Sequence, residues 1–178
     1  MSERNPYILL KNEKETELLK SRTQALAQSS AAIEEALMRL GAVEYLIFWA
    51  GSHRYALDVR FAGEVHVEVY CEPLPYVPEL IRGIANIRGE IMVLIDLSLL
   101  MGFEPQAKRS QYNVIPLHFN GRKLGIIVDE FEDLSSIPTK HILSEAAVPR
   151  HIQGMTISQI YIIQAQSLIY DERIYIVD

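Results

Sequence analysis

The strongest constraint on the fold of this chain is a pattern of short apolar segments that recurs after about 70 residues. Four features of the pattern match at nearly the same offset: the hairpin glycines, the return strands, the glycines before the second hairpins, and the closing apolar pairs. In that order, the matched positions are Gly51 and Gly121, 56–57 and 126–127, Gly83 and Gly154, and 99–100 and 168–169. Each copy therefore contains a hairpin, a third strand, a proline-containing loop, a second hairpin and a short helical turn.

Two copies of a small, mainly β unit are the simplest fold for this repeat. Several short strands leave exposed edges, and closure into a barrel removes them. We place the two barrel halves at about 43–103 and 112–178. A unit of about 60–70 residues buries too little apolar surface to be stable alone, so the two halves are expected to share a core.

The segment before Gly41 has a different composition. Residues 1–12 are turn-prone and predict a flexible arm. The following residues up to Leu40 lack proline and glycine and consist mainly of strong helix formers. Apolar residues recur there every seven positions, at Leu19, Leu26, Ile33 and Leu40. We therefore predict an N-terminal α-helix over 13–41 with Gly41 as its C-cap. The sequence leaves open whether this helix packs on its own domain or binds a partner.

Composition excludes several classes of protein. The chain has 178 residues, of which 49% are apolar and 22% charged, as in ordinary globular domains. No apolar run approaches the length of a membrane span, and the first residues lack a secretory signal pattern, so we expect a cytoplasmic protein without direct membrane insertion. A net charge of −6 argues against broad nucleic-acid binding. The single cysteine, Cys71, excludes an internal disulfide and a multi-cysteine metal site.

The sequence offers no convergent set of catalytic groups. The five histidines lack metal-ligand spacing, and neither a Gly-x-Ser-x-Gly elbow nor a glycine-rich phosphate loop is present. The adjacent acids Asp129 and Glu130 end a strand and are interpreted as a solvated turn. We therefore predict that the protein is not an enzyme and uses no metal or cofactor.

Surface recognition remains, and the segment from Leu80 to Glu90 is the most informative for it. Arg88 and Gly89 occupy the tip of a hairpin between the apolar segments 84–87 and 91–95. A planar guanidinium on a rigid turn suits fork-like hydrogen bonding to a carboxylate or carbonyl of a partner.

These residues resemble the CheW-like domain, the adaptor module of bacterial chemosensory systems. The family hallmark of a glycine, an asparagine, an Arg-Gly turn and an apolar strand ending in Asp-Leu corresponds to residues 83–97. A second hallmark, glycine followed by three apolar residues and an aspartate, corresponds to residues 125–129. A first motif corresponds to residues 55–59, followed by Glu64 and Val65. The resemblance covers about residues 43–170.

The resemblance implies a mainly β fold of two intertwined five-stranded SH3-like barrels that share a core, forming a CheW-like domain over 43–178. It also implies a non-catalytic scaffold in two-component signal transduction. Such adaptors couple the cytoplasmic tip of a methyl-accepting chemoreceptor to the regulatory domain of a CheA-type histidine kinase, at membrane-associated receptor arrays. The residues implied in partner binding are Arg88, with Asn86 and Gly89 of the same turn, and the apolar candidates Val59, Val65 and Val67.

Three other functions stay open at this stage. The N-terminal extension exceeds the minimal adaptor, and this is similar to the PilI-like adaptors of type IV pilus twitching motility. A second alternative is a regulatory module that binds a small ligand, with the proline-rich loop 72–78 as the rim of its site. In the third, the helix over 13–40 blocks the partner groove and makes the protein a negative regulator.

Overall fold

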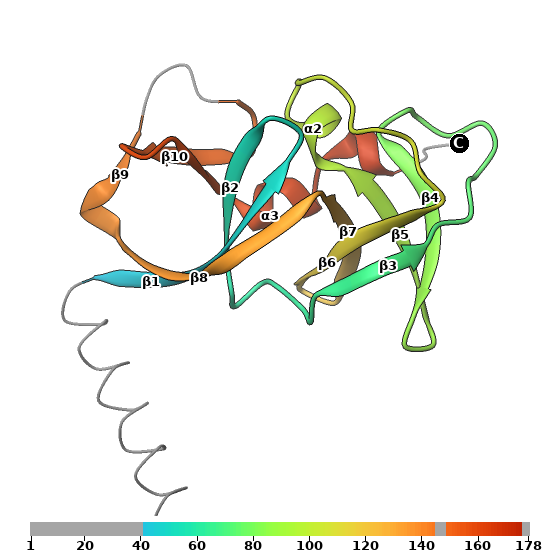
Figure 1. Cartoon of the computed structure of the whole chain (residues 1–178), viewed down its shortest axis with the longest axis horizontal. Coiled ribbons are helices and arrows are strands. Elements are labelled where there is room, and N and C mark those ends of the chain that lie inside the picture. The colour runs from blue at the N-terminus through green and yellow to red at the C-terminus, as the bar shows by residue number, and fades with distance from the viewer. Residues whose placement is uncertain (1–40, 145–148, 176–178) are drawn as a thin grey trace, which may run out of the picture. The chain divides into compact units, whose positions relative to one another are not determined.

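The structure is a computed structural model that describes residues 41–144 and 149–175 (Figure 1). The residues after Ala42 form one compact unit, which is mainly β. The predicted arm over 1–12 lies outside the described residues. So does the predicted helix over 13–41, except for Gly41, which belongs to a turn. None of the helices in the described part of the chain is long and apolar enough to cross a membrane.

The first of the two sheets has the strand order β8-β1-β2-β11-β10-β9. It combines segments from the beginning and the end of the described chain. Its strands are β1 (Ala42–Ala50), β2 (His53–Asp58), β8 (Glu130–Pro138), β9 (Ile142–Leu143), β10 (Ile152–Thr156) and β11 (Ile160–Ile163).

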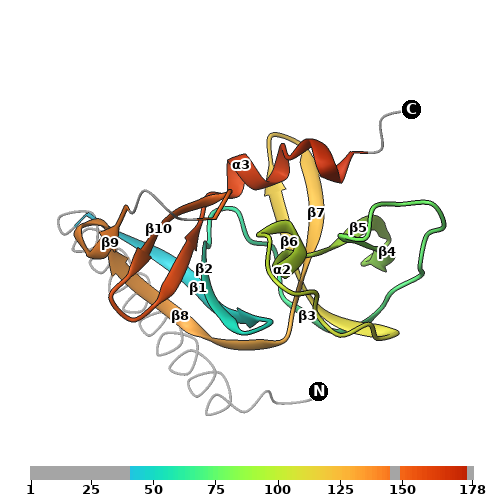
Figure 2. The same cartoon turned by 90° about the horizontal axis from the view of Figure 1, so that it is seen from above.

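The second sheet has the order β3-β6-β7-β5-β4 and lies entirely within the middle of the chain. Its strands are β3 (His66–Tyr70), β4 (Ile81–Ile87), β5 (Glu90–Asp96), β6 (Gln111–Phe119) and β7 (Arg122–Val128). Two short α-helices and two 3-10 turns complete the described structure: α2 (Leu97–Leu100), α3 (Ala165–Ile169), η1 (Thr139–His141) and η2 (Glu172–Ile174). Figure 2 shows the two sheets as two lobes, with β1, β2, β8, β9 and β10 in one and β3 to β7 in the other.

The 70-residue repeat is visible in this topology. If each strand of one copy is replaced by its counterpart in the other copy, β8-β1-β2-β11-β10 becomes β3-β6-β7-β5-β4, which is the order of the second sheet. The two sheets thus have the same plan, and β9 is an addition to the first. The arrangement is consistent with the pair of small barrels that the sequence predicted.

The predicted assignment of one barrel to 43–103 and the other to 112–178 is wrong. The hairpin β1–β2 of the first copy joins strands of the second copy, and β6–β7 joins strands of the first. Parallel pairing closes each junction, with Tyr55 opposite Tyr161 in one sheet and Ile126 opposite Ile95 in the other. Parallel strands need long connections, so a pattern of local hairpins gives no information about these pairings.

A single buried apolar cluster crosses from one sheet to the other. It contains Phe48 and Leu57 of the first sheet together with Ile115 and Ile126 of the second. Helix α3 follows β11 of the first sheet in sequence but packs on β6 and β7 of the second. The two lobes therefore share apolar surface and hold each other in place, as the small size of each repeat requires.

The described chain ends in a 3-10 turn rather than a strand. Ile174 ends the 3-10 turn η2 and Tyr175 follows it without strand pairing, while residues 176–178 lie outside the description. The side chain of Asp171 accepts a hydrogen bond from the backbone N–H of Arg173, and this Asx-type contact favours the turn over an extended strand.

Candidate functional site

The tip of the β4–β5 hairpin is a tight two-residue turn. Ile87 and Glu90 are paired across the strands, and the intervening Arg88 and Gly89 have φ values of 54° and 86°. Two successive positive φ values define the turn type that matches the twist of a hairpin. The side-chain oxygen of Asn86 accepts a hydrogen bond of 2.8 Å from the backbone N–H of Gly89. Asn86 and Gly89 therefore shape the turn that presents Arg88.

Arg88 forms a two-pronged ion pair with Glu64. Its Nη1 lies 2.5 Å from Oε2 of the glutamate, and its Nη2 donates to Oε1 at 2.6 Å. Both side chains remain largely in solvent, with 68% and 59% of their surface exposed. An ion pair this exposed contributes little to stability, so folding alone does not explain it. The guanidinium is paired with Glu64 and is still accessible to a partner.

The Arg88–Glu64 pair borders a shallow groove of about 300 Å³, which we call the Arg88 groove. Its lining is Glu64, His66, Ile87, Arg88, Glu90, Met92, Pro116 and His118. Lys123 binds Glu90 at 2.6 Å beside the groove, and this hydrogen bond lowers the pKa of the Glu90 carboxyl. Partial burial lowers the pKa of His118, which favours the neutral imidazole. The groove thus combines an apolar floor with charged side chains at its edge.

The three predicted apolar contact residues differ in how far they are accessible. Val67 lies on β3, one of the two edge strands of the second sheet, and 65% of its surface is exposed. Val59 and Val65 are half-buried, and Val65 packs against the main core. Ile91, which the sequence analysis did not select, is 67% exposed and lies opposite Asn86 in the β4–β5 pairing. Neither Val67 nor Ile91 lines the Arg88 groove, whose apolar lining is Ile87, Met92 and Pro116.

The first hallmark aspartate, Asp96, is fully buried and structural. Its carboxylate accepts hydrogen bonds from the backbone N–H groups of Leu99 at 3.1 Å and Gln106 at 2.9 Å. It also binds Nη2 of the buried Arg82 at 2.5 Å, and the same Nη2 donates to the Gln106 carbonyl at 2.8 Å. Asp96 is thus the N-cap of α2. The sequence did not predict that Arg82 is the counter-ion of Asp96.

The second hallmark aspartate, Asp129, joins the two sheets. Its Oδ2 accepts from the backbone N–H of Gly51 at 2.8 Å and from Nε2 of Gln106 at 3.1 Å. Gly51 is the turn of the β1–β2 hairpin, whereas Asp129 follows β7 of the other sheet. The interpretation of Asp129 as a solvated turn residue is wrong, because its carboxylate bridges the two lobes. Both hallmark acids therefore support the scaffold rather than the exposed site.

A buried polar cluster near the C-terminal end contains a serine, a histidine and an aspartate. Ser167 Oγ lies 2.7 Å from Nδ1 of His151, and Asp171 Oδ2 lies 2.5 Å from Nε2. Arg173 binds the same aspartate at 2.7 Å and also donates to the carbonyl of Leu100. This cluster ties η2 to the end of α2. Within residues 41–144 and 149–175, no group of three His, Cys, Asp or Glu side chains could hold a metal ion.

Residues 44–173 match the CheW-like domain family, and the chain belongs to this family. This confirms the resemblance drawn from the motifs. The match spans both sheets and includes the Arg88 groove together with the two hallmark acids, Asp96 and Asp129.

Individual relatives agree with this assignment. The chemotaxis protein CheW of Klebsiella aerogenes is 30% identical over 99 residues, which are 56% of this chain and 60% of that protein's length. Protein PilI of Pseudomonas aeruginosa is 27% identical over 139 residues, or 75% of this chain and 76% of the relative. The crystal structure of the scaffolding protein TtCheW from Thermoanaerobacter tengcongensis superposes with a TM-score of 0.64 at 27% identity, covering 74% of this chain and 95% of the other.

Proposed function

We propose that this protein is a non-catalytic adaptor that couples the cytoplasmic tip of a methyl-accepting chemoreceptor to a CheA-type histidine kinase. The observation that carries the proposal is the exposed Arg88–Glu64 pair on a rigid hairpin turn beside the Arg88 groove. Membership of the CheW-like family supports it, as does the similarity to a protein named for scaffolding. The work of such an adaptor is assembly rather than chemistry.

The Arg88 groove has the composition of a recognition surface. Arginine can bind a carboxylate with two parallel hydrogen bonds, and it is common at the energetic centre of protein interfaces. A partner carboxylate would compete with Glu64 for the guanidinium, and Ile87, Met92 and Pro116 would supply apolar contact area in the groove beside it. The turn fixes the backbone at Arg88 before the partner arrives, so little backbone entropy is lost on binding.

The shared core gives a physical basis for coupling two partners. We propose that the two sheets form SH3-like barrels and act as one rigid body, because the carboxylate of Asp129 and a continuous apolar cluster join them. A partner on each lobe would then be held in a fixed relation to the other. A shift of the receptor between states could change the kinase only through differential contacts with this body. The site of action would be cytoplasmic, at receptor arrays.

The test is binding of purified partners by the full chain. A receptor-tip fragment and the kinase regulatory domain are each titrated against wild type and Arg88→Ala, and folding is checked by thermal melting. Arg60→Ala is the matched control, because Arg60 is 71% exposed and also pairs with an acid, Asp58, at 2.6 Å. We expect Arg88→Ala to weaken at least one partner about tenfold or more, as loss of a charge-assisted bond does, and Arg60→Ala to bind as wild type.

Exchanging the charges separates recognition from folding. The double variant Arg88→Glu with Glu64→Arg can re-form the internal ion pair with its ends reversed. If Arg88 contacts a partner carboxylate, the double variant stays defective in binding. Full recovery of binding would show that the pair matters only within the chain, and wild-type binding by a folded Arg88→Ala would refute the proposal.

A second candidate function is a PilI-like role in type IV pilus twitching motility. The alignment with Protein PilI extends over 75% of this chain, compared with 56% for the CheW of Klebsiella aerogenes. Complementation distinguishes the two roles. The gene is introduced into one strain lacking its PilI-like adaptor and another lacking its CheW, and twitching zones and swimming rings are measured. Recovery of twitching alone supports the PilI-like role, and recovery of swimming alone contradicts it.

A further inference from the structure

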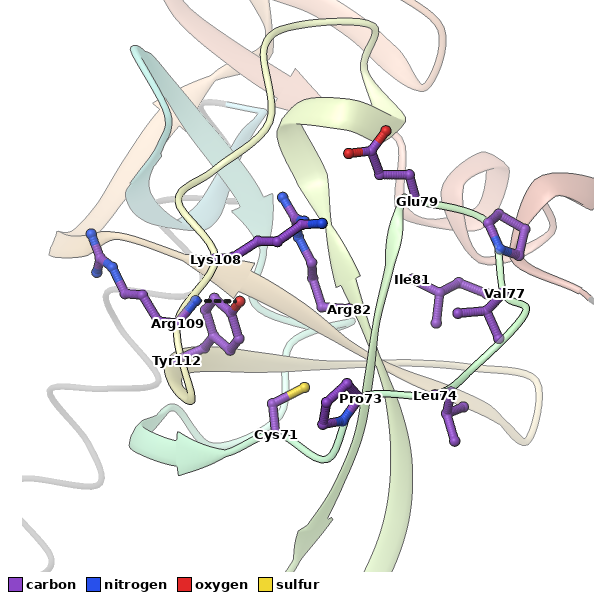
Figure 3. A pocket seen from close by; sticks show the side chains of 11 residues that line it. Cys71, Pro73, Leu74, Val77, Glu79, Ile81, Arg82, Lys108, Arg109 and Tyr112 are labelled. Carbon is purple, nitrogen blue, oxygen red and sulfur yellow. Dashed lines mark hydrogen bonds between the residues drawn. The ribbon is translucent and has the colours of Figure 1, made fainter.

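A second pocket lies beneath the proline-rich loop, away from the Arg88 groove. It has a volume of about 310 Å³ and lies among this loop, β4, and the segment that leads into β6 (Figure 3). The lining is Cys71, Pro73, Leu74, Val77, Pro78, Glu79, Ile81, Arg82, Lys108, Arg109 and Tyr112. The two pockets have no lining residue in common. The volume is at the lower end of the range for small-molecule sites.

The polar part of this lining has an excess of positive charge. Arg82, Lys108 and Arg109 face a single lining acid, Glu79. Lys108 makes no ion pair within the described parts of the chain, and Arg109 has only a long one, 3.9 Å from Asp129. Figure 3 shows the side chain of Lys108 extending toward the Arg82 side of the pocket, whereas that of Arg109 points away. Lys108 is thus the cation best placed to meet a ligand.

Arg82 adds donor capacity at the base of the pocket. Only 4% of its side chain is exposed, and Nη2 is committed to Asp96 and the Gln106 carbonyl. Its Nε is buried and has no hydrogen-bond partner among the residues that the structure describes. A buried N–H without a partner is costly, and a nearby anion would lower that cost.

The remaining lining is apolar and limits the kind of anion. Pro73, Leu74, Val77 and Ile81 come from the loop and β4, and Figure 3 shows them on the opposite side of the pocket from Arg109. Burial raises the pKa of the Cys71 thiol, so this side chain stays protonated and adds apolar surface. A fully hydrated inorganic ion would leave this wall uncovered, and a neutral apolar molecule would bury Lys108 without a partner.

We propose that the pocket binds a small organic carboxylate, with the carboxylate at Lys108 and the apolar body against the loop residues. The proposal does not depend on the adaptor function, because the Arg88 groove uses different residues. It assigns a regulatory ligand site to β4, the strand that leads to the hairpin bearing Arg88.

The test uses matched pairs of an acid and a neutral analogue with the full chain. Sodium benzoate and sodium hexanoate are titrated beside benzamide and 1-hexanol at constant ionic strength, and binding is followed by calorimetry and by the shift in melting temperature. We expect saturable binding of at least one acid and about tenfold weaker binding or none for its neutral analogue. Acetate should bind more weakly than hexanoate, since it covers less of the apolar wall.

Two variants test where in the pocket the ligand binds. Lys108→Ala should weaken the acid about tenfold, and Leu74→Trp should block it by filling the apolar part of the pocket. Lys140→Ala is the control, because Lys140 is an exposed lysine in η1 outside the pocket. Equal binding of acid and amide, an unchanged affinity in folded Lys108→Ala, or no saturable binding of any acid would each overturn the proposal. Failure here would leave the binding of receptor and kinase intact, so it is distinguishable from failure of the adaptor function.

Discussion

Asp96→Asn should be among the most destabilising single changes in the protein. The substitution keeps the size of the side chain and its ability to cap α2, but it removes the negative charge that faces Arg82. Both partners are almost completely buried, with 4% and 0% exposure, so Arg82 would be left as an uncompensated buried charge. Removing one partner of a buried ion pair costs about 3–5 kcal/mol.

This cost is measurable by thermal and urea unfolding. For a domain of this size, about 4 kcal/mol corresponds to a fall in melting temperature of about 8–16 °C. The matched control is Asp58→Asn, because the partner of Asp58 is the exposed Arg60. That change should cost about 1 kcal/mol or less, because the arginine that loses its partner is 71% exposed and is hydrated by solvent, unlike Arg82.

A double variant tests the reasoning directly. Replacing Arg82 by Met in the Asp96→Asn background removes the stranded charge, so the double variant should be more stable than Asp96→Asn alone. If Asp96→Asn costs no more than Asp58→Asn, the buried pair is not what holds this region together. If the two changes simply add, the assumed cost of an unpaired Arg82 is wrong.

Two further predictions concern the backbone and the pH dependence. Gly83→Ala should destabilise by more than about 2 kcal/mol, because φ is 149° and an added Cβ would lie 2.1 Å from the carbonyl oxygen of Glu72. Gly121→Ala is the comparison, because there is open space around Gly121, and it should cost about 1–2 kcal/mol. Both free energies of unfolding are measured by urea titration. Burial lowers the pKa of His151, which favours the neutral ring, so the unfolded chain binds the proton more readily and stability should decline as the pH falls below about 6.5. In His151→Gln the melting temperature should change less between pH 7 and about 5 than in wild type. If its dependence on pH is the same as in wild type, His151 is not the group responsible.

The hairpins were predictable because their turns have a local chemical signature. Asn120 and Gly121 both adopt positive φ, as a two-residue hairpin loop requires, and the same holds for Arg88 and Gly89. The capping of α2 by Asp96 was equally local, since a side chain and a backbone N–H three residues later decide it. Signals of this kind depend on a few neighbouring residues, so they can be recognised without knowledge of the tertiary structure.

The exchange of strands between the two copies had no such signal. The pairing of β2 with β11 joins residues about a hundred positions apart, and both strands read as ordinary apolar segments. Hydrophobic alternation sets which face of a strand is buried but not which strand lies beside it. The repeat in the sequence therefore predicted two equivalent units and assigned the wrong strands to each.

The site was predictable only in part for the same reason. Arg88 could be selected from its place in a turn, whereas its partner Glu64 lies 24 residues earlier in the chain. Glu64 follows the first family motif, and this position was the only feature of the sequence that pointed to a role for it. Asp129 was misread because a polar residue at the end of a strand is usually solvated, and only the tertiary contact with Gly51 gives it a structural role.

Reconstitution of a signalling complex tests the central claim most directly. Membranes containing a chemoreceptor are mixed with a CheA-type kinase, and autophosphorylation from labelled ATP is measured with and without the full chain. The adaptor account predicts that the kinase sediments with the receptor and responds to the receptor's attractant only when the chain is present, and that Arg88→Ala abolishes this response while Arg60→Ala keeps it. A kinase that stays in the supernatant and keeps its basal rate at saturating wild-type protein, with cognate receptors and kinases from both chemotaxis and pilus systems, would contradict the account.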